Sequence, residues 1–281
     1  MFLEGKAKII GVISIIVISI LLFTCEQDVK KYVVISHTRL DDNSGINSYV
    51  ANANLSEYDV LLLGGDLANL SSYDDSILKY LDSKFDISSP KTLWALGNHD
   101  YYNVDLLKRY TKKETYYSYV LDNTVFMVLD TELDSSRISG EQLVFFNSVI
   151  DTISNYDNLI VLTHKLIWMR GNNKLEGMID TVSNGHYGDC SYCIQENNFY
   201  IDIYPKLTAL SNVGFKVFCV AGDIGFKAKQ FQYYTEEGIN FLATGVRKNE
   251  SNNYYIEFWS HKAHGTLTYE FKLLESLPVI E

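Results

Sequence analysis

Short apolar runs that end abruptly in glycine or polar residues recur along this chain and constrain its fold more than any other feature. Valine, isoleucine and leucine dominate these runs, which is typical of strands buried on both faces. Segments of helical character lie between them, so strand and helix alternate and an α/β sheet is predicted. The predicted strands are 32–35, 60–63, 92–96, 125–129, 159–162 and 217–220, and the predicted helices are 45–54, 72–83, 139–153 and 204–211.

The C-terminal third has a different character. Residues 240–243, 254–259 and 267–271 are separated by turn residues, which predicts antiparallel strands that close a second sheet. With 281 residues and 47% hydrophobic content, the chain is expected to form one globular domain over residues 32–275.

A segment without periodicity, residues 166–204, interrupts this rhythm. It is long for a connection within a compact domain. We interpret it either as a lid or specificity insertion, or as a packed surface loop stapled by Cys190 and Cys193. A CxxC pair without a second CxxC favours a local disulfide over a zinc site in an oxidising compartment. Cys219, inside an apolar run, is expected to be a buried small hydrophobe.

The N-terminus carries the features of a targeting signal. Lys6 and Lys8 precede an apolar run at 9–23, as in the charged and hydrophobic regions of a signal peptide over residues 1–25. The run is short for a spanning helix of about 20 residues, and its end, Leu22-Phe23-Thr24-Cys25, resembles a bacterial lipobox. That resemblance implies a lipoprotein lipidated at Cys25, and the alternative is an uncleaved hydrophobic anchor. Both place the domain outside the cytoplasm and on a membrane.

Polar residues follow directly after the predicted strands. The carboxyl ends of strands in an open α/β sheet converge on one crevice, so these residues are expected to meet. Asp, Asn and His together suit a first-row divalent metal ion. A net charge of -11 opposes binding to phosphate backbones, so nucleic acid is excluded as a partner. The polar segments are Ser36–Arg39, Gly64–Asp66, Gly97–Asp100, Thr163–His164 and Ala221–Gly225.

This ordered set resembles the signature of the calcineurin-like metallophosphoesterases, D-x-H, G-D, G-N-H-D/E, H and G-H-x-H, each after a strand. Gly65-Asp66, Gly97-Asn98-His99-Asp100 and His164 match it. The resemblance spans roughly residues 32–271. It implies an α/β (α+β) fold in which two mixed β-sheets pack face to face between helices, in four αββα layers.

The first and last motifs depart from the family pattern. One family metal site maps onto Asp66, Asn98, His164 and Asp223, where an aspartate replaces a histidine. These four residues suit one divalent ion, whether Mn, Fe, Zn or Mg.

The other family site maps onto His37, Arg39, Asp66 and Gly225 and is predicted to be empty. A guanidinium cannot ligate a metal, and glycine has no side chain. Arg39 either places its charge where the missing cation would sit, or forms a salt bridge that seals a dead site.

The resemblance implies a phosphoester hydrolase, a phosphatase or phosphodiesterase, that uses one divalent ion, and the N-terminal signal places it outside the cytoplasm. Its catalytic residues would be His99 as general acid, Arg39 and His37, and its activity is expected to be weak or unusual beside two-metal relatives. The substrate would be a phosphorylated small molecule or an envelope-associated compound. The alternatives are a catalytically inactive protein that binds a phosphorylated ligand, glycan or partner protein, and metal-free chemistry by the same three residues.

The other polar candidates carry weaker signals. His186 is expected to be solvated in the 166–204 segment, and His261 and His264 are expected on the surface. Asp100 and Asp130 either orient His99 or a metal ligand, or make structural hydrogen bonds.

Overall fold

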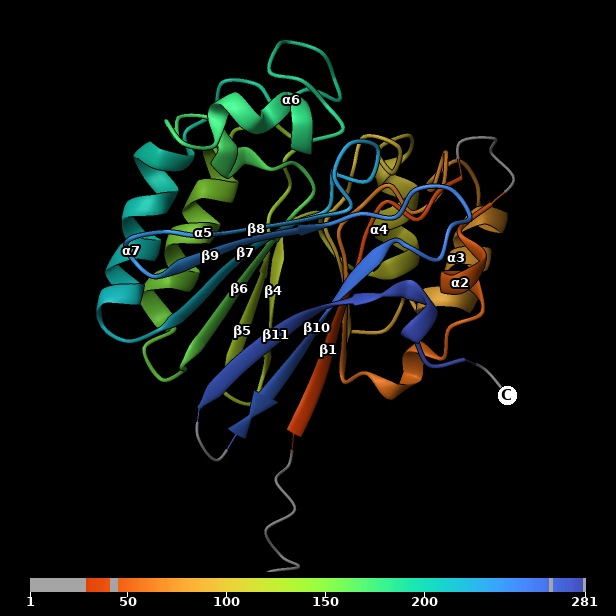
Figure 1. Cartoon of the computed structure of the whole chain (residues 1–281), viewed down its shortest axis with the longest axis horizontal. Coiled ribbons are helices and arrows are strands. Elements are labelled where there is room, and N and C mark those ends of the chain that lie inside the picture. Colours follow the sequence, from red (N-terminus) through yellow and green to blue (C-terminus); the bar gives the residue numbers. More distant parts are fainter. Residues whose placement is uncertain (1–28, 41–44, 263–264, 280–281) are drawn as a thin grey trace, which may run out of the picture.

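The computed structural model describes residues 29–40, 45–262 and 265–279. The predicted signal segment, Cys25 and His264 lie outside these ranges. Two mixed β-sheets form the centre of the molecule, and helices cover their outer faces (Figure 1). The fold class predicted from the motifs is confirmed.

The first sheet has the strand order β11-β10-β1-β2-β3. Its three N-terminal strands are parallel, and β10 and β11 add to β1 in antiparallel fashion. The bounds are β1 (Val29–Ile35), β2 (Val60–Leu63), β3 (Thr92–Trp94), β10 (Tyr254–His261) and β11 (Thr266–Leu273).

The second sheet has the order β4-β5-β6-β7-β9-β8. Its four inner strands are parallel and its two edge strands are antiparallel. The bounds are β4 (Tyr117–Leu121), β5 (Thr124–Val128), β6 (Asn158–Thr163), β7 (Lys216–Ala221), β8 (Gln230–Tyr234) and β9 (Ile239–Thr244).

Burial on both faces explains the continuous apolar runs. In β1, Tyr32 and Val34 point into the core between the two sheets, where Tyr32 packs edge-on against Phe126. Their neighbours Val33 and Ile35 face the opposite way, into the core beneath the helices of the first sheet. Successive residues of a strand alternate between faces, so a strand covered on both sides needs apolar residues at every position.

The helices divide between the two sheets. Helices α2 (Ser48–Ala51), α3 (Asp75–Phe85) and α4 (Val104–Thr111) cover the first sheet, and α5 (Gly140–Thr152) and α7 (Tyr204–Asn212) cover the second (Figure 1). The Asp74 side chain caps α3 by accepting from the backbone N–H groups of Ser76 and Ile77. Short turns complete the fold: η1 (Leu55–Glu57), η2 (Ile167–Met169), η3 (Glu176–Met178), α6 (Ile179–Val182), the π-helical η4 (Phe199–Ile203) and η6 (Leu274–Ser276).

Two expectations about elements were wrong. The helix predicted at 45–54 is reduced to α2, because Asn47 caps a single turn that ends at Asn52. The three C-terminal strands do not close a sheet together: β10 and β11 extend the first sheet beside β1, and β9 lies in the second sheet, parallel to β7 and antiparallel to β8. Helix α4 and the edge strands β4 and β8 were not predicted; both strands are short and half exposed, so they lack a buried apolar run.

The 166–204 segment packs on the core of the second sheet. Trp168 is buried and stacks on Phe241 of β9, with ring centroids 4.9 Å apart. The predicted disulfide between Cys190 and Cys193 is present, and Cys219 is buried as expected. No helix in the ranges that the structure describes is both long and apolar enough to cross a membrane.

Candidate metal-dependent site

A cavity of about 240 Å³ opens where the ends of β1, β2, β3 and β7 converge. A larger cavity of about 400 Å³ lies against α3 and η1, but none of the predicted site residues lines it. We therefore assign the chemistry to the smaller cavity. It is lined by the predicted site residues His37, Arg39, Asp66, Asn98, His99 and Asp223, and by Asn184, Gly185, Tyr192 and Phe226, which we call the rim residues.

Asp66 lies at the centre of the site. It follows β2 in a left-handed conformation with φ of 54°, and its side chain is almost fully buried. The backbone N–H of His99 donates to its Oδ1 at 3.1 Å. The backbone N–H of Asp66 donates to Oδ2 of Asp100 at 2.7 Å, and the same oxygen accepts from the backbone N–H of Gly97 at 2.9 Å. Asp100 therefore holds together the two loops that carry Asp66 and His99.

The two carboxylate oxygens of Asp66 face different groups. Oδ1 lies 3.7 Å from Nε2 of His164. Oδ2 lies 3.4 Å from Nε of Arg39 and 3.6 Å from Nε2 of His37. On the His164 side, Oδ1 of Asp223 lies 3.9 Å from the same Nε2. A single carboxylate thus divides the centre into a His164–Asp223 side and an Arg39–His37 side.

His164 is fully buried below the cavity. Its Nδ1 lies 2.7 Å from the carbonyl oxygen of Gly64, which can only accept a hydrogen bond. Nδ1 therefore carries a proton, and Nε2 of the neutral ring has a free lone pair directed toward the two carboxylates. Nε2 has no hydrogen-bond partner in the structure. An oriented but unpartnered imidazole nitrogen of this kind is typical of a metal ligand.

The carboxylates give this side of the centre an excess of negative charge. Burial alone would lower the pKa of His164, but Asp66, Asp223 and Glu132 outweigh burial and raise it to about 9. Burial raises the pKa of Asp66, yet the surrounding imidazoles and Arg39 hold it below its usual range. The His164–Asp223 side therefore favours a positive charge, either a proton on His164 or a bound cation.

The donor set fits one divalent ion by its chemistry, although its side chains are spread slightly too far apart. Neighbouring ligands of an ion with bonds of about 2.1 Å lie about 3.0 to 3.4 Å from each other. The separations from His164 are 3.7 and 3.9 Å. Accordingly, within the described ranges no three His, Cys, Asp or Glu side chains are already arranged around a common point. Small side-chain rotations of Asp66 and Asp223 would close the set, and Asn98 lines the same cavity.

The Arg39–His37 side does not fit a metal ion. Gly225 supplies no ligand, and its φ of 130° is a backbone conformation that other residues rarely adopt. A Cβ at this position would lie 3.0 Å from the carbonyl oxygen of Val246. His37 is buried, and burial lowers its pKa, so its ring is neutral. The guanidinium of Arg39 is the permanent positive charge beside Asp66 on this side.

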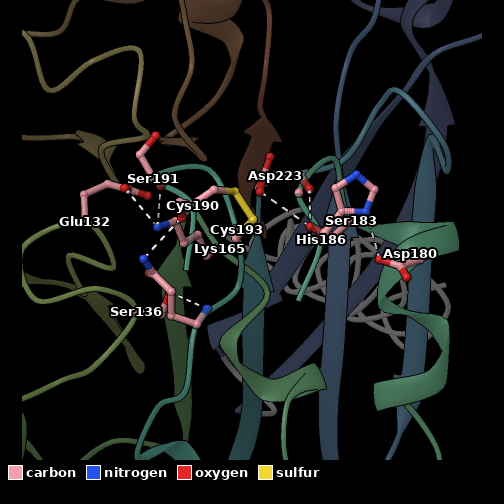
Figure 2. Close-up of a disulfide and its surroundings, with 12 residues drawn as sticks. Glu132, Ser136, Lys165, Asp180, Ser183, His186, Cys190, Ser191, Cys193 and Asp223 are labelled. Carbon is pink, nitrogen blue, oxygen red and sulfur yellow. Dashed lines mark hydrogen bonds and ion pairs between the residues drawn. A yellow bond between two sulfur atoms is a disulfide. The ribbon is translucent and has the colours of Figure 1, made fainter. Parts of the chain in front are cut away.

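The remaining candidates are placed as follows. The His99 ring is oriented by the carbonyl oxygen of Asn69, 2.7 Å from its Nδ1. Asp130 accepts from the Tyr101 hydroxyl at 2.7 Å and does not line the cavity, so its hydrogen bonds are structural. His186 is exposed and contacts Asp180 at 3.0 Å (Figure 2), and it does not line the cavity although the preceding Gly185 does. His261 ends β10.

The rim residues were missed by sequence reasoning. The Phe226 ring packs edge-on against His37, with centroids 5.3 Å apart, and lies 5.9 Å from Cζ of Arg39. Its position directly after Gly225 of the last motif was the available signal. Tyr192 lies between the cysteines of the CxxC pair, in the 166–204 segment that was interpreted either as a lid or specificity insertion or as a packed surface loop, but no pattern singled out this side chain.

Comparisons with known proteins agree with this fold. The family model described as calcineurin-like phosphoesterase matches residues 37–147. A dimetal phosphatase from Danio rerio has a similar structure, with a TM-score of 0.57 and 10% identity, covering 87% of this chain and 96% of that one. GAP50 of Plasmodium, titled the anchor in the inner membrane complex, has a TM-score of 0.53 and 12% identity. The match covers 90% of this chain and 87% of GAP50. The search of curated proteins found no match.

The fold and the ordered strand-end motifs define a metallophosphoesterase scaffold. The region that the calcineurin-like phosphoesterase model matches, residues 37–147, contains the strand-end motifs of Asp66 and Asn98. The resemblance predicted from the motifs is confirmed. The family-model match supports phosphoester hydrolysis as the reaction class and implies dependence on a divalent metal.

Proposed function

We propose that this chain is an extracytoplasmic, membrane-attached phosphoester hydrolase that uses a single divalent ion. The observation that carries the proposal is that the two carboxylate oxygens of Asp66 face different groups. Oδ1 faces the unpartnered Nε2 of His164, and Oδ2 faces Arg39 at 3.4 Å. In the two-ion pattern of the family this aspartate is shared by both ions. Here a metal ion would bind on the His164 side of Asp66, and the Arg39 guanidinium would stand in place of the second ion.

The metal-binding residues would be Asp66, Asn98, His164 and Asp223. A bound divalent ion supplies Lewis-acid charge to a phosphoryl oxygen and makes water a better nucleophile. The rest of the chemistry falls to the chain's own side chains. Arg39, with 14% of its side chain exposed, is positioned to donate to phosphate oxygens and offset developing charge.

His99 supplies the proton for the leaving oxygen in this proposal. Its ring lines the cavity, and the carbonyl oxygen of Asn69 holds Nδ1. Nε2 is therefore the atom that exchanges a proton with the substrate. His37 acts as a neutral positioning residue, since it packs against Phe226 and lies 3.6 Å from Asp66 on the Arg39 side.

Substrate size and cellular location rest on separate observations. The cavity of about 240 Å³ is below the roughly 300–1,000 Å³ of drug-sized ligand sites, which favours a small phosphorylated molecule. The location rests on the N-terminal sequence and on the Cys190–Cys193 disulfide, which suits an oxidising compartment. Cell fractionation and incorporation of labelled palmitate test it. A Cys25→Ser variant should lose the label, and equal labelling of both proteins contradicts lipidation at Cys25.

The runner-up is an inactive binding protein on the same scaffold. The fold itself does not choose, because it is shared with a dimetal phosphatase and with a protein titled an anchor. The scattered donor separations on the His164 side are the observation that favours this alternative.

Metal content and turnover separate the two proposals. We expect about one ion per chain by elemental analysis, and hydrolysis of aryl phosphates that Asp66→Ala and His164→Gln abolish together with metal binding. His186→Ala is the control, because His186 is exposed and outside the cavity. Two ions with a full rate would contradict the single-ion proposal. A protein that binds no ion and hydrolyses no ester would exclude the hydrolase and support the inactive binding protein.

A further inference from the structure

The side chain of Tyr192 has no structural role that its contacts explain. It lines the cavity and is 50% exposed. Among the ranges that the structure covers, no hydrogen bond to its hydroxyl and no ring contact is found. A half-exposed tyrosine at the mouth of a polar cavity presents a free aromatic face to whatever enters.

The backbone that carries this ring is held from several directions. The Cys190–Cys193 disulfide closes the loop, and the N–H of Cys193 donates to the carbonyl of Cys190 at 3.0 Å (Figure 2). Nζ of Lys165 donates to the carbonyl of Ser191 at 2.9 Å. On the other side, a Cβ at Gly185 would lie 2.1 Å from the carbonyl oxygen of Tyr192, so only glycine permits this approach.

The restraint by Lys165 carries a desolvation cost for the folded state. Lys165 is 1% exposed and pairs with the buried Glu132 at 3.1 Å (Figure 2). Removing two charges from water costs several kcal/mol per ion before their attraction is counted. Lys165 follows His164 directly, so its ammonium connects the CxxC loop to the strand end that carries a predicted metal ligand. The buried pair therefore fixes the loop relative to the reacting centre.

The cavity lining combines two kinds of side chain. The charged groups of Asp66, Asp223 and Arg39 line it together with the rings of Tyr192 and Phe226. A phosphoryl group would lie against the charged groups under the proposed function, so the group attached to it would lie against a ring. The cavity of about 240 Å³ must hold both parts, which favours a single ring over a larger group.

We propose that Tyr192 determines specificity and selects phosphoesters whose alcohol carries a single flat aromatic ring close to the ester oxygen. The inference rests on the proposed function for the phosphate end of the substrate. The disulfide, the Lys165–Glu132 pair and Gly185 act as positioning elements for the ring. Tyr192 itself takes part in binding through stacking rather than in proton transfer.

Two substrates of matched reactivity test the inference. Benzyl phosphate and cyclohexylmethyl phosphate have similar size and both release a primary alcohol, but only the first presents a flat π face. We expect wild type to prefer the benzyl ester in kcat/KM, and Tyr192→Ala to reduce that preference roughly three- to tenfold, as expected for the loss of one aromatic pair. Tyr192→Phe keeps the ring and should keep the preference. Tyr234→Ala, at an exposed site on the edge strand β8, is the control.

The positioning elements give a second readout. Cys190→Ser with Cys193→Ser should reduce the preference toward that of Tyr192→Ala while the fold still melts cooperatively. An unchanged preference in Tyr192→Ala would overturn the inference and leave the proposed hydrolase intact.

Ligand binding separates the two proposals when turnover is absent. Calorimetry with benzylphosphonate, which is not hydrolysed, should show binding that is weaker in Tyr192→Ala and equal in Tyr234→Ala. If no ester is hydrolysed but this difference is found, the proposed activity fails and recognition by Tyr192 stands. Equal benzylphosphonate affinity in wild type and Tyr192→Ala overturns it.

Discussion

Replacing Arg39 by methionine is expected to weaken the fold and tighten metal binding at the same time. Arg39 lies 3.4 Å from Oδ2 of Asp66, and the two side chains are 14% and 3% exposed. Unit charges at that distance attract by about 5 kcal/mol at an effective dielectric constant of about 20. His37 and His164 remain within 3.6 and 3.7 Å of the same carboxylate and retain part of the compensation.

The expected loss of unfolding free energy in the metal-free protein is therefore about 3 kcal/mol, the low end for breaking a buried pair. Methionine preserves most of the side-chain length, so packing against Phe226 changes little. Urea unfolding with a chelator present measures this loss. Lys229→Met is the control, because Lys229 pairs with the half-exposed Glu250 and should contribute less than about 1 kcal/mol.

Metal affinity should change in the opposite direction. A guanidinium on one side of Asp66 repels a cation on the other side, so its removal should raise the affinity for Mn²⁺ by roughly tenfold or more. Calorimetric titration at pH 8 measures this with Asp66 ionised. Weaker Mn²⁺ binding, or unfolding equal to that of wild type, would refute the view that Arg39 replaces a cation.

Turnover distinguishes the two roles left open for Arg39. If the guanidinium contacts the phosphoryl group, Arg39→Met should lower kcat about 10²- to 10³-fold. Arg39→Lys should recover part of that loss, because it restores the charge without the planar donors. If kcat is unchanged at saturating metal, Arg39 only forms a salt bridge that fills the second family site and has no part in catalysis.

Two further predictions concern His164 and Gly225. The folded pKa of His164 is about 9 against an ordinary 6.5. The resulting stabilisation of the metal-free protein should be complete below pH 6.5 and lost as pH rises through 9, by up to about 3 kcal/mol. His164→Gln should lack this component in urea unfolding at pH 6 and pH 10, and identical pH profiles would contradict it. Gly225→Ala should cost about 1–3 kcal/mol from its positive φ and the nearby Val246 carbonyl. Gly214→Ala, also at positive φ but with open space around it, should cost less in thermal unfolding, and equal costs would show that the Val246 contact is harmless.

Local signals explain how much of the fold was predictable. Strands buried on both faces need apolar residues at every position, so β1, β2, β5, β6 and β7 were visible as continuous runs. The direction of β9 relative to its neighbour β7 was not visible, because it depends on the path of residues 222–238 and on the insertion of β8 between them in the chain. The short helix α2 was overestimated because a periodic pattern does not reveal that Asn47 and Asn52 bound a single turn.

In the candidate site, too, some residues could be predicted from local sequence and others depend on tertiary contacts. Asp66, Asn98, His164 and Asp223 follow strands, and strand ends converge for geometric reasons, so their proximity could be expected. Tyr192 reaches the cavity from a segment without periodicity. Its position depends on a disulfide, a buried ion pair and a glycine contact, which are tertiary interactions that no local pattern encodes.

The conformation of Gly225 bears on whether the second ion site could be regained. The second family site would need an aspartate at 37 and histidines at 39 and 225, and a histidine at 225 would have to adopt a φ of 130° with its Cβ 3.0 Å from the carbonyl oxygen of Val246. The loop after β7 would first have to move. Under the proposed one-ion arrangement, a second ion site therefore requires a backbone rearrangement in addition to substitutions.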